Sequence, residues 1–206
     1  SYNTKSLNKT LVIKNKINSE FKFFKKIKKI KKSILFVTGY HPQKNLQNIL
    51  PYLFKNLKGY SINIVGLSYK NLDKLIQSQV MKEGKNKNKI NIYEYLSKKK
   101  LIKVYKKNEI FLMPSLFESF SIPLLEACLL NNIILCSNTG ATKETTKHKA
   151  IYFKHNNLKE IKEKIEKISR LSPKKKKKIL TKQSKILKNN QEFQDEKNYQ
   201  KLIRSL

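Results

Sequence analysis

The sequence has only two cysteines, no Walker phosphate loop and no Gly-x-Gly-x-x-Gly motif, and these absences exclude several classes of protein. Two cysteines are too few for a disulfide scaffold or a cysteine-based zinc module. Cys128 and Cys136 both lie in apolar stretches, which is typical of small core residues in a reducing compartment. Without either glycine-rich motif, the NTPase and dehydrogenase classes also lose support.

Long apolar runs are absent as well. No run approaches the roughly 20 apolar residues that a membrane-spanning helix needs. Residues 1–20 lack the apolar core of a signal peptide. We therefore expect a cytoplasmic protein. The chain begins at Ser1 without a methionine, which suggests a fragment or a processed product.

Acidic residues are scarce, with 14 Asp and Glu against 46 Lys and Arg, so the formal net charge is +32. The basic residues are almost all lysine, because Arg170 and Arg204 are the only arginines. Surfaces that bind nucleic acid usually combine arginine with interleaved aromatic side chains. The composition is also rich in Lys, Asn and Ile, as an AT-rich gene would give. Charge alone therefore does not indicate nucleic acid as a partner.

The chain divides near residue 34. Residues 1–33 are polar and basic, and we interpret them as a linker or the remnant of a preceding domain. From there, short apolar, β-branched runs alternate with segments of helical periodicity. The expected strands are 34–38, 61–65, 90–93, 109–113, 133–136 and 150–153. The expected helices are 44–57, 71–82, 97–107, 123–130, 157–169, 173–189 and 194–205.

This alternation predicts an α/β fold over residues 34–206, with a doubly wound, Rossmann-like parallel sheet and helices at its C-terminal end. Such sheets bind ligands beyond the carboxyl ends of their strands. The loops expected at that edge are 38–44, 66–70, 94–97, 113–122 and 137–143.

The most informative loop runs from Pro114 to Ala127, between a buried strand and a helix. The amides of residues 120–122, together with the positive end of the helix dipole, suit an anionic group. Glu118 precedes the helix start and Glu126 lies about one turn inside it. A ligand with a central phosphate and hydroxyls at both ends, such as a nucleotide sugar, would fit. The alternative is that Glu126 pairs within the fold and Glu118 is a solvated loop acid.

This stretch resembles the E-x7-E signature of the family 4 glycosyltransferases, which are retaining enzymes of the GT-B fold. The residues in register are Pro114, Ser115, Glu118, Phe120, Pro123, Glu126 and Ala127. Residues 34–45 resemble the first strand and phosphate loop of that family, and 62–66 its second strand. Similar matches at 137–144 and in the final helix extend the resemblance over about 33–206. That range corresponds to the donor-binding C-terminal half of the GT-B fold.

The resemblance implies two catalytic residues and a donor-binding group. Glu118 would bind hydroxyls of the donor sugar beside the reaction centre, and Lys44 would neutralise the diphosphate. Glu126 would bind the ribose. The other donor-binding residues implied are Gly39, Ser119, Phe120, Ser121 and Ile122 around the phosphates and Tyr95 and Leu96 around the base.

The sequence departs from the family text at three places. Gly39 stands where many members have an arginine that pairs with the lysine. Ser119 and Ser121 replace two glycines that usually follow the first glutamate. The glycine before the fifth strand is replaced by Asn131-Asn132. Because asparagine tolerates a left-handed backbone, we expect the last change to be mild.

Metal dependence can be argued from the acids. Asp73 and Asp195 are the only aspartates, and they lie far apart in the sequence. No Asp-x-Asp pair is therefore available to hold a divalent cation against a diphosphate. We expect sugar transfer without a metal or other cofactor.

The leading hypothesis is a hexosyltransferase of polysaccharide biosynthesis that uses a glycan or lipid-linked acceptor. Its N-terminal acceptor domain would lie outside this chain or on a partner chain. Peripheral contact with the inner face of an anionic membrane is compatible with that role. Two alternatives remain: a non-catalytic remnant of the fold, and a basic protein that docks on a membrane or nucleic acid. Docking would use Lys25–Lys32, Lys98–Lys100 and Lys174–Lys178.

Overall fold

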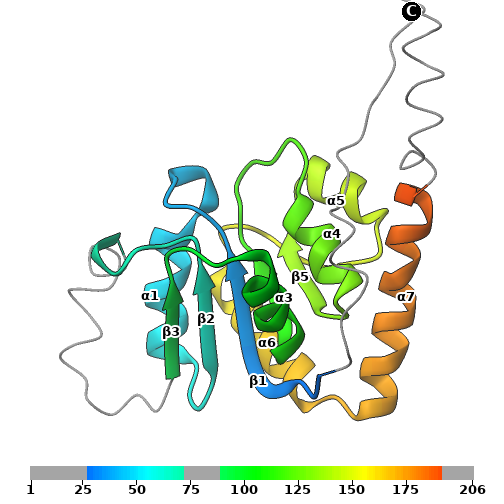
Figure 1. The fold of residues 1–206 in the computed structure, drawn as a ribbon, viewed down its shortest axis with the longest axis horizontal. Helices are drawn as coiled ribbons and strands as arrows, with labels where there is room; N and C mark the ends of the chain where they lie inside the picture. The colour runs from blue at the N-terminus through cyan, green and yellow to red at the C-terminus, as the bar shows by residue number, and fades with distance from the viewer. Residues whose placement is uncertain (1–26, 72–88, 192–206) are drawn as a thin grey trace, which may run out of the picture.

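A computed structural model describes residues 27–71 and 89–191 as one parallel sheet flanked by helices (Figure 1). The strands are β1 (Ile30–Val37), β2 (Ser61–Val65), β3 (Lys89–Tyr93), β4 (Asn108–Met113), β5 (Ile133–Ser137) and β6 (Ile151–Phe153). The helices are the short 3-10 turn η3 (Pro42–Lys44), α1 (Leu46–Asn56), α3 (Lys98–Lys107), α4 (Ile122–Leu129), α5 (Gly140–Thr146), α6 (Leu158–Arg170) and α7 (Pro173–Gln191).

The sheet has six strands in the order β3-β2-β1-β4-β5-β6, and every pairing is parallel. The doubly wound, Rossmann-like fold expected from the sequence is confirmed. The order reverses between β1 and β4, which are neighbours although two strands separate them in the chain. In sheets of this kind the crevice at such a reversal is where ligands bind.

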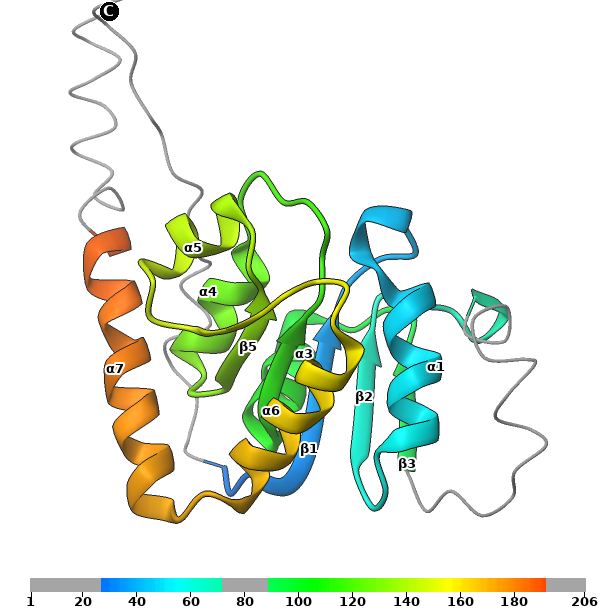
Figure 2. The same ribbon diagram turned by 180° about the vertical axis from the view of Figure 1, so that it is seen from behind.

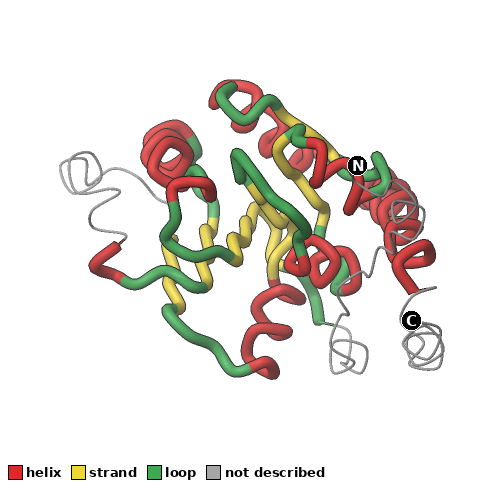
Figure 3. Tube along the Cα trace, turned by 90° about the horizontal axis from the view of Figure 1, so that it is seen from above, coloured by secondary structure: helices red, strands yellow, loops and turns green. Residues whose placement is uncertain are grey.

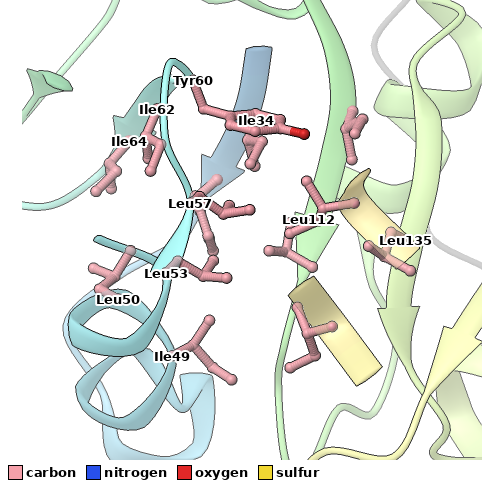
Figure 4. Packing of buried hydrophobic residues seen from close by; sticks show 14 of the residues in the cluster. Ile34, Ile49, Leu50, Leu53, Leu57, Tyr60, Ile62, Ile64, Leu112 and Leu135 are labelled. Carbon is pink, nitrogen blue, oxygen red and sulfur yellow. The ribbon is translucent and has the colours of Figure 1, made fainter. Parts of the chain in front are cut away.

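Helices cover both faces of the sheet, which explains why the strands are apolar without alternation. Ile34 and Phe36 of β1 pack in the cluster that includes α1 and α6, whereas Leu35 packs with α3, α4 and α7. Figure 2 shows α1 and α6 together on the first face. In Figure 4, Leu53 and Leu57 point from α1 and the residue after it toward the strands. This packing supports the loops at the carboxyl ends of the strands.

Strand β1 begins at Ile30, earlier than the residue 34 expected from the sequence. Ser33 is fully buried, and its hydroxyl accepts a hydrogen bond from the Glu109 amide at 2.9 Å. The Lys29 ammonium donates to the carbonyl oxygens of Asn108 (2.8 Å) and Leu130 (3.2 Å). Burial lowers the pKa of Lys29 to about 7. The last residues of the basic 1–33 segment therefore contribute to the sheet, although their lysine-rich sequence hides it.

The sequence predicts a loop at 137–143, whereas the structure contains helix α5 from Gly140 to Thr146. Thr139 caps the helix by a reciprocal arrangement with Thr142, in which each side chain bonds the other residue's backbone. The signal was present as a Thr-x-x-Thr spacing, but it lacks the Glu or Gln that usually marks such a capping box.

Candidate functional site

A cavity of about 170 Å³ lies at the reversal point of the sheet, beyond the ends of β1 and β4. Figure 3 looks onto this edge, where loops cross the ends of the strands. Its walls come from the end of β1, η3, the end of β4 and the loop that leads into α4. Five of the residues predicted from the sequence line it: Lys44, Glu118, Phe120, Ser121 and Ile122.

An ion pair crosses the cavity between two loops 74 residues apart in the chain. The Lys44 Nζ lies 2.7 Å from Glu118 Oε1, and the two side chains are 26% and 10% exposed. The Ser115 hydroxyl donates to the same carboxylate oxygen at 2.7 Å. The Leu116 amide also donates to the Gln43 carbonyl at 2.8 Å, which ties the loops together. The charged pair is therefore held in place by both side-chain and backbone contacts.

Helix α4 presents its N-terminus to this cavity. Ser121 is the N-cap residue, but no side chain caps the helix. Its hydroxyl instead donates to the Met113 sulfur at 3.1 Å. Pro123 lies in the first turn, where backbone N–H groups have no partner within the helix, so the lack of an N–H costs nothing. The positive end of the helix dipole thus adds to the Lys44 charge at one place, as an anionic ligand requires.

The serines that replace the family's glycines fit without backbone strain. Ser121 has φ −112° and ψ 96°, an extended conformation that any residue adopts. Neither serine is among the residues with positive φ, whereas Asn131 is, with φ 58°. Asn131 therefore adopts, before the fifth strand, the left-handed conformation that asparagine tolerates.

Glu126 lies outside the lining of the cavity, between α4 and α3. The hydroxyl of the buried Tyr105 donates to its Oε2 at 2.9 Å. Burial raises the pKa of the Glu126 carboxyl, and the hydrogen bond from Tyr105 opposes that rise. Burial also raises the pKa of Tyr105, and the nearby Glu126 charge adds to this effect. Glu126 is thus a carboxylate that the fold holds at an energetic disadvantage.

Replacing Glu126 with glutamine is expected to stabilise the protein at neutral pH. A raised pKa means that the folded state favours the protonated acid. The free energy of unfolding therefore falls as the pH rises from the ordinary pKa of a glutamate through the raised pKa of Glu126. Glutamine cannot ionise and still accepts from Tyr105. Glu126→Gln should therefore match the wild type near pH 4 and exceed it near pH 7.5 by on the order of 1 kcal/mol. Urea unfolding at both pH values measures this, and an advantage independent of pH would contradict it.

The remaining predicted residues share the same edge but do not line the cavity. Gly39 follows β1 and lies against the His41 ring, and Ser119 is exposed between Glu118 and Phe120. Tyr95 and Leu96 follow β3, and Tyr95 is 87% exposed. Thr38 and Ser115 line the cavity without having been assigned a role from the sequence, although Ser115 stands in the motif itself.

The described residues include no cluster of three or more His, Cys, Asp or Glu side chains that could hold a metal ion. Lys44 is the one cationic side chain that lines the cavity in the part of the chain that the structure describes.

Comparisons with known proteins show the family of the sequence and the kind of fold. The sequence model for glycosyl transferases group 1 matches residues 18–186. No curated protein is similar enough to count as a match. The structure resembles the C-terminal domain of a glycosyl transferase group 1 family protein (LpcC) from Francisella tularensis. The TM-score is 0.62 at 18% identity, and the match covers 78% of this chain and 87% of that one.

Two longer proteins show the same likeness. A glycosyltransferase from Rickettsia africae matches with a TM-score of 0.63 at 20% identity, over 78% of this chain and 43% of that chain. An E. coli trehalose-6-phosphate protein bound with UDP-2-fluoro glucose matches at 0.67 and 14% identity, over 85% and 43%. This chain thus spans less than half the length of either. At these identities the likeness shows the fold alone, and it confirms one half of a GT-B fold.

Proposed function

Because this chain belongs to the glycosyl transferases group 1 family, we propose that its cavity binds the diphosphate of a nucleotide sugar for metal-independent, retaining hexosyl transfer. The observation that carries the proposal is the Lys44–Glu118 pair beside the N-terminus of α4, at the reversal point of the sheet. One side of the pair suits phosphate and the other suits sugar hydroxyls.

The arrangement fits the charge changes of glycosyl transfer. As the glycosidic bond breaks, negative charge builds on the leaving diphosphate. The Lys44 ammonium and the positive end of α4 would stabilise this charge in a partly buried site. Glu118 would accept hydrogen bonds from the donor sugar, with Ser115 holding its carboxylate in place. Lys44 would then supply the positive charge that a divalent cation provides in other enzymes.

The same edge carries a rim of exposed apolar side chains. Five of the six large hydrophobic residues exposed in the described ranges follow β1, β2, β3 or β4, namely Tyr40, Tyr69, Tyr95, Leu116 and Phe117. A gathering of this kind usually marks a contact surface. We infer that the rim contacts an N-terminal acceptor domain or partner chain, which would bring a glycan or lipid-linked acceptor to the donor. Polysaccharide biosynthesis is the setting that this reaction suits.

Calorimetry with UDP-, GDP- and ADP-sugars in the presence of EDTA tests the donor site. We expect one nucleotide to bind best, and chelation to leave its affinity unchanged. Lys44→Ala should weaken binding by about 10-fold to 100-fold, because it removes a charged hydrogen bond in a partly buried site. Lys55→Ala, an exposed lysine on α1, removes the same charge and should have little effect. A folded sample that binds no nucleotide would overturn the proposal and favour a non-catalytic remnant.

A further inference from the structure

Helix α7 carries charge of one sign only. Its sequence between Pro173 and Gln191 contains no acidic residue and begins with the lysine run Lys174–Lys178. Figures 1 and 2 both place α7 at one side of the molecule, next to α4 and far from α1 and β3. None of the interactions that form the candidate donor site involves this helix.

The helix divides its residues between an inner face and an outer lysine stripe. The stripe comprises Lys174, Lys177, Lys178, Lys182 and Lys185, which line a shallow open hollow of about 410 Å³ with Thr181. These positions recur at helical spacing, so the ammonium groups point the same way. All five lysines are exposed. In residues 27–71 and 89–191, none of the five forms an ion pair with an acid.

The inner face fixes the orientation of the stripe. Lys176 turns inward from the lysine run and pairs with Glu109 at 2.6 Å. The Gln183 side chain accepts from the Ile134 amide and donates to the Ile134 carbonyl, both at 3.2 Å. Ile186 is fully buried. The apolar side of α7 therefore packs inside the fold, and the lysine stripe faces outward.

We propose that the lysine stripe of α7 binds the surface of an anionic lipid bilayer. A flat row of lysines complements a layer of acidic headgroups, to which each lysine near the surface adds roughly a fivefold factor in affinity. Nucleic acid fits less well, because the stripe contains no arginine and no aromatic side chain. Among the described helices, none is long and apolar enough to cross a membrane. Because lysines form the stripe, with one threonine beside them, the contact is electrostatic and is reversed by salt.

Vesicle sedimentation with a charge-matched control tests this proposal. The stripe variant replaces Lys174, Lys178, Lys182 and Lys185 with glutamine. The control variant replaces Lys99, Lys100, Lys103 and Lys107 of α3, which are also exposed, so the net charge falls equally in both. Wild-type protein should bind phosphatidylglycerol vesicles at about 0.1 M salt, release them near 0.5 M, and ignore phosphatidylcholine vesicles. The stripe variant should bind at least about 50-fold more weakly, and the control less than about fivefold.

Three results would overturn the proposal. Equal losses in the two variants would show that total charge, not the stripe, governs binding. Failure of the wild type to bind anionic vesicles would remove the lipid partner. Tighter binding to an RNA or DNA duplex than to vesicles, lost in the stripe variant, would assign the stripe to nucleic acid. Lys44→Ala should bind vesicles as the wild type does, so a failed donor site would leave this result unaffected.

Discussion

Gly66→Ala is expected to lower the free energy of unfolding by about 3 kcal/mol or more, from overpacking together with backbone strain. Gly66 follows β2 with φ +92°, and a Cβ atom there would lie 2.3 Å from the Thr38 carbonyl oxygen. Neither backbone can easily move away. The Gly66 amide donates to the Tyr93 carbonyl at 2.8 Å, and the Thr38 amide donates to the Val65 carbonyl at 2.9 Å. The clash and the strain therefore affect the ends of β1, β2 and β3 together.

Two other glycines separate these effects. Gly59 also has a positive φ, +74°, but nothing lies within 4 Å of its added Cβ, so Gly59→Ala should show only the conformational loss of about 1 kcal/mol. Gly140 begins α5 without a positive φ and with open space around it, so Gly140→Ala should be neutral or stabilising. Urea unfolding of the three variants gives the ranking. Equal losses for Gly66→Ala and Gly59→Ala would show that the contact with Thr38 is unimportant.

The parallel sheet could be predicted because the sequence of each strand shows that it is buried on both faces. A strand buried on both faces needs apolar side chains at successive positions, as in Ile34-Leu35-Phe36 or Ile133-Ile134-Leu135, and few other structures produce such short runs. Helices α1 and α6 could also be predicted, because their buried residues recur at helical spacing. The helices expected at 71–82 and 194–205 lie almost wholly or wholly outside the described residues.

The start of β1 could not be predicted, because the residues there contact partners that are distant in the sequence. Helix α5 could not be predicted, because its cap is of an unusual kind. Lys29 is an ordinary lysine in the sequence, and only the fold brings the carbonyls of Asn108 and Leu130 to its ammonium group. Ser33 likewise becomes a buried acceptor only when the Glu109 amide is beside it. Local patterns predict elements, whereas contacts of this kind exist only in the assembled sheet.

The candidate site shows the same division. The motif and the loop after the first strand predicted Lys44 and Glu118 separately, Lys44 as a residue for phosphate and Glu118 as one for sugar. Their direct ion pair, and the Ser115 hydroxyl that supports it, depend on the adjacency of β1 and β4. The hydrogen bond between Tyr105 and Glu126 depends in turn on how α3 packs beside α4.

Because Lys44 and Glu118 form this ion pair, Lys44→Ala and Glu118→Gln should change the binding of a nucleoside diphosphate in opposite directions. The Glu118 carboxylate, 2.7 Å from the Lys44 Nζ, competes with an incoming phosphate for the same ammonium group. Neutralising Glu118 leaves that group free, while removing Lys44 leaves an unpaired carboxylate facing the anion. Lys44→Ala should weaken binding of the diphosphate by about 10-fold to 100-fold. Glu118→Gln should keep or strengthen it by a few fold, at about the scale of a partly exposed ion pair.

The sugar should reverse the effect of Glu118→Gln. A carboxylate that accepts hydrogen bonds from sugar hydroxyls makes a charged contact, of about 1.5–3 kcal/mol, which glutamine replaces with a weaker neutral one. The wild type should therefore bind the nucleotide sugar more tightly than the free diphosphate, and Glu118→Gln should lose most of that difference, about 10-fold or more. Calorimetry with both ligands on both variants measures the crossing. If Glu118→Gln weakened the two ligands equally, Glu118 would support the cavity wall and not the sugar, because a contact to the sugar cannot affect a ligand that has none.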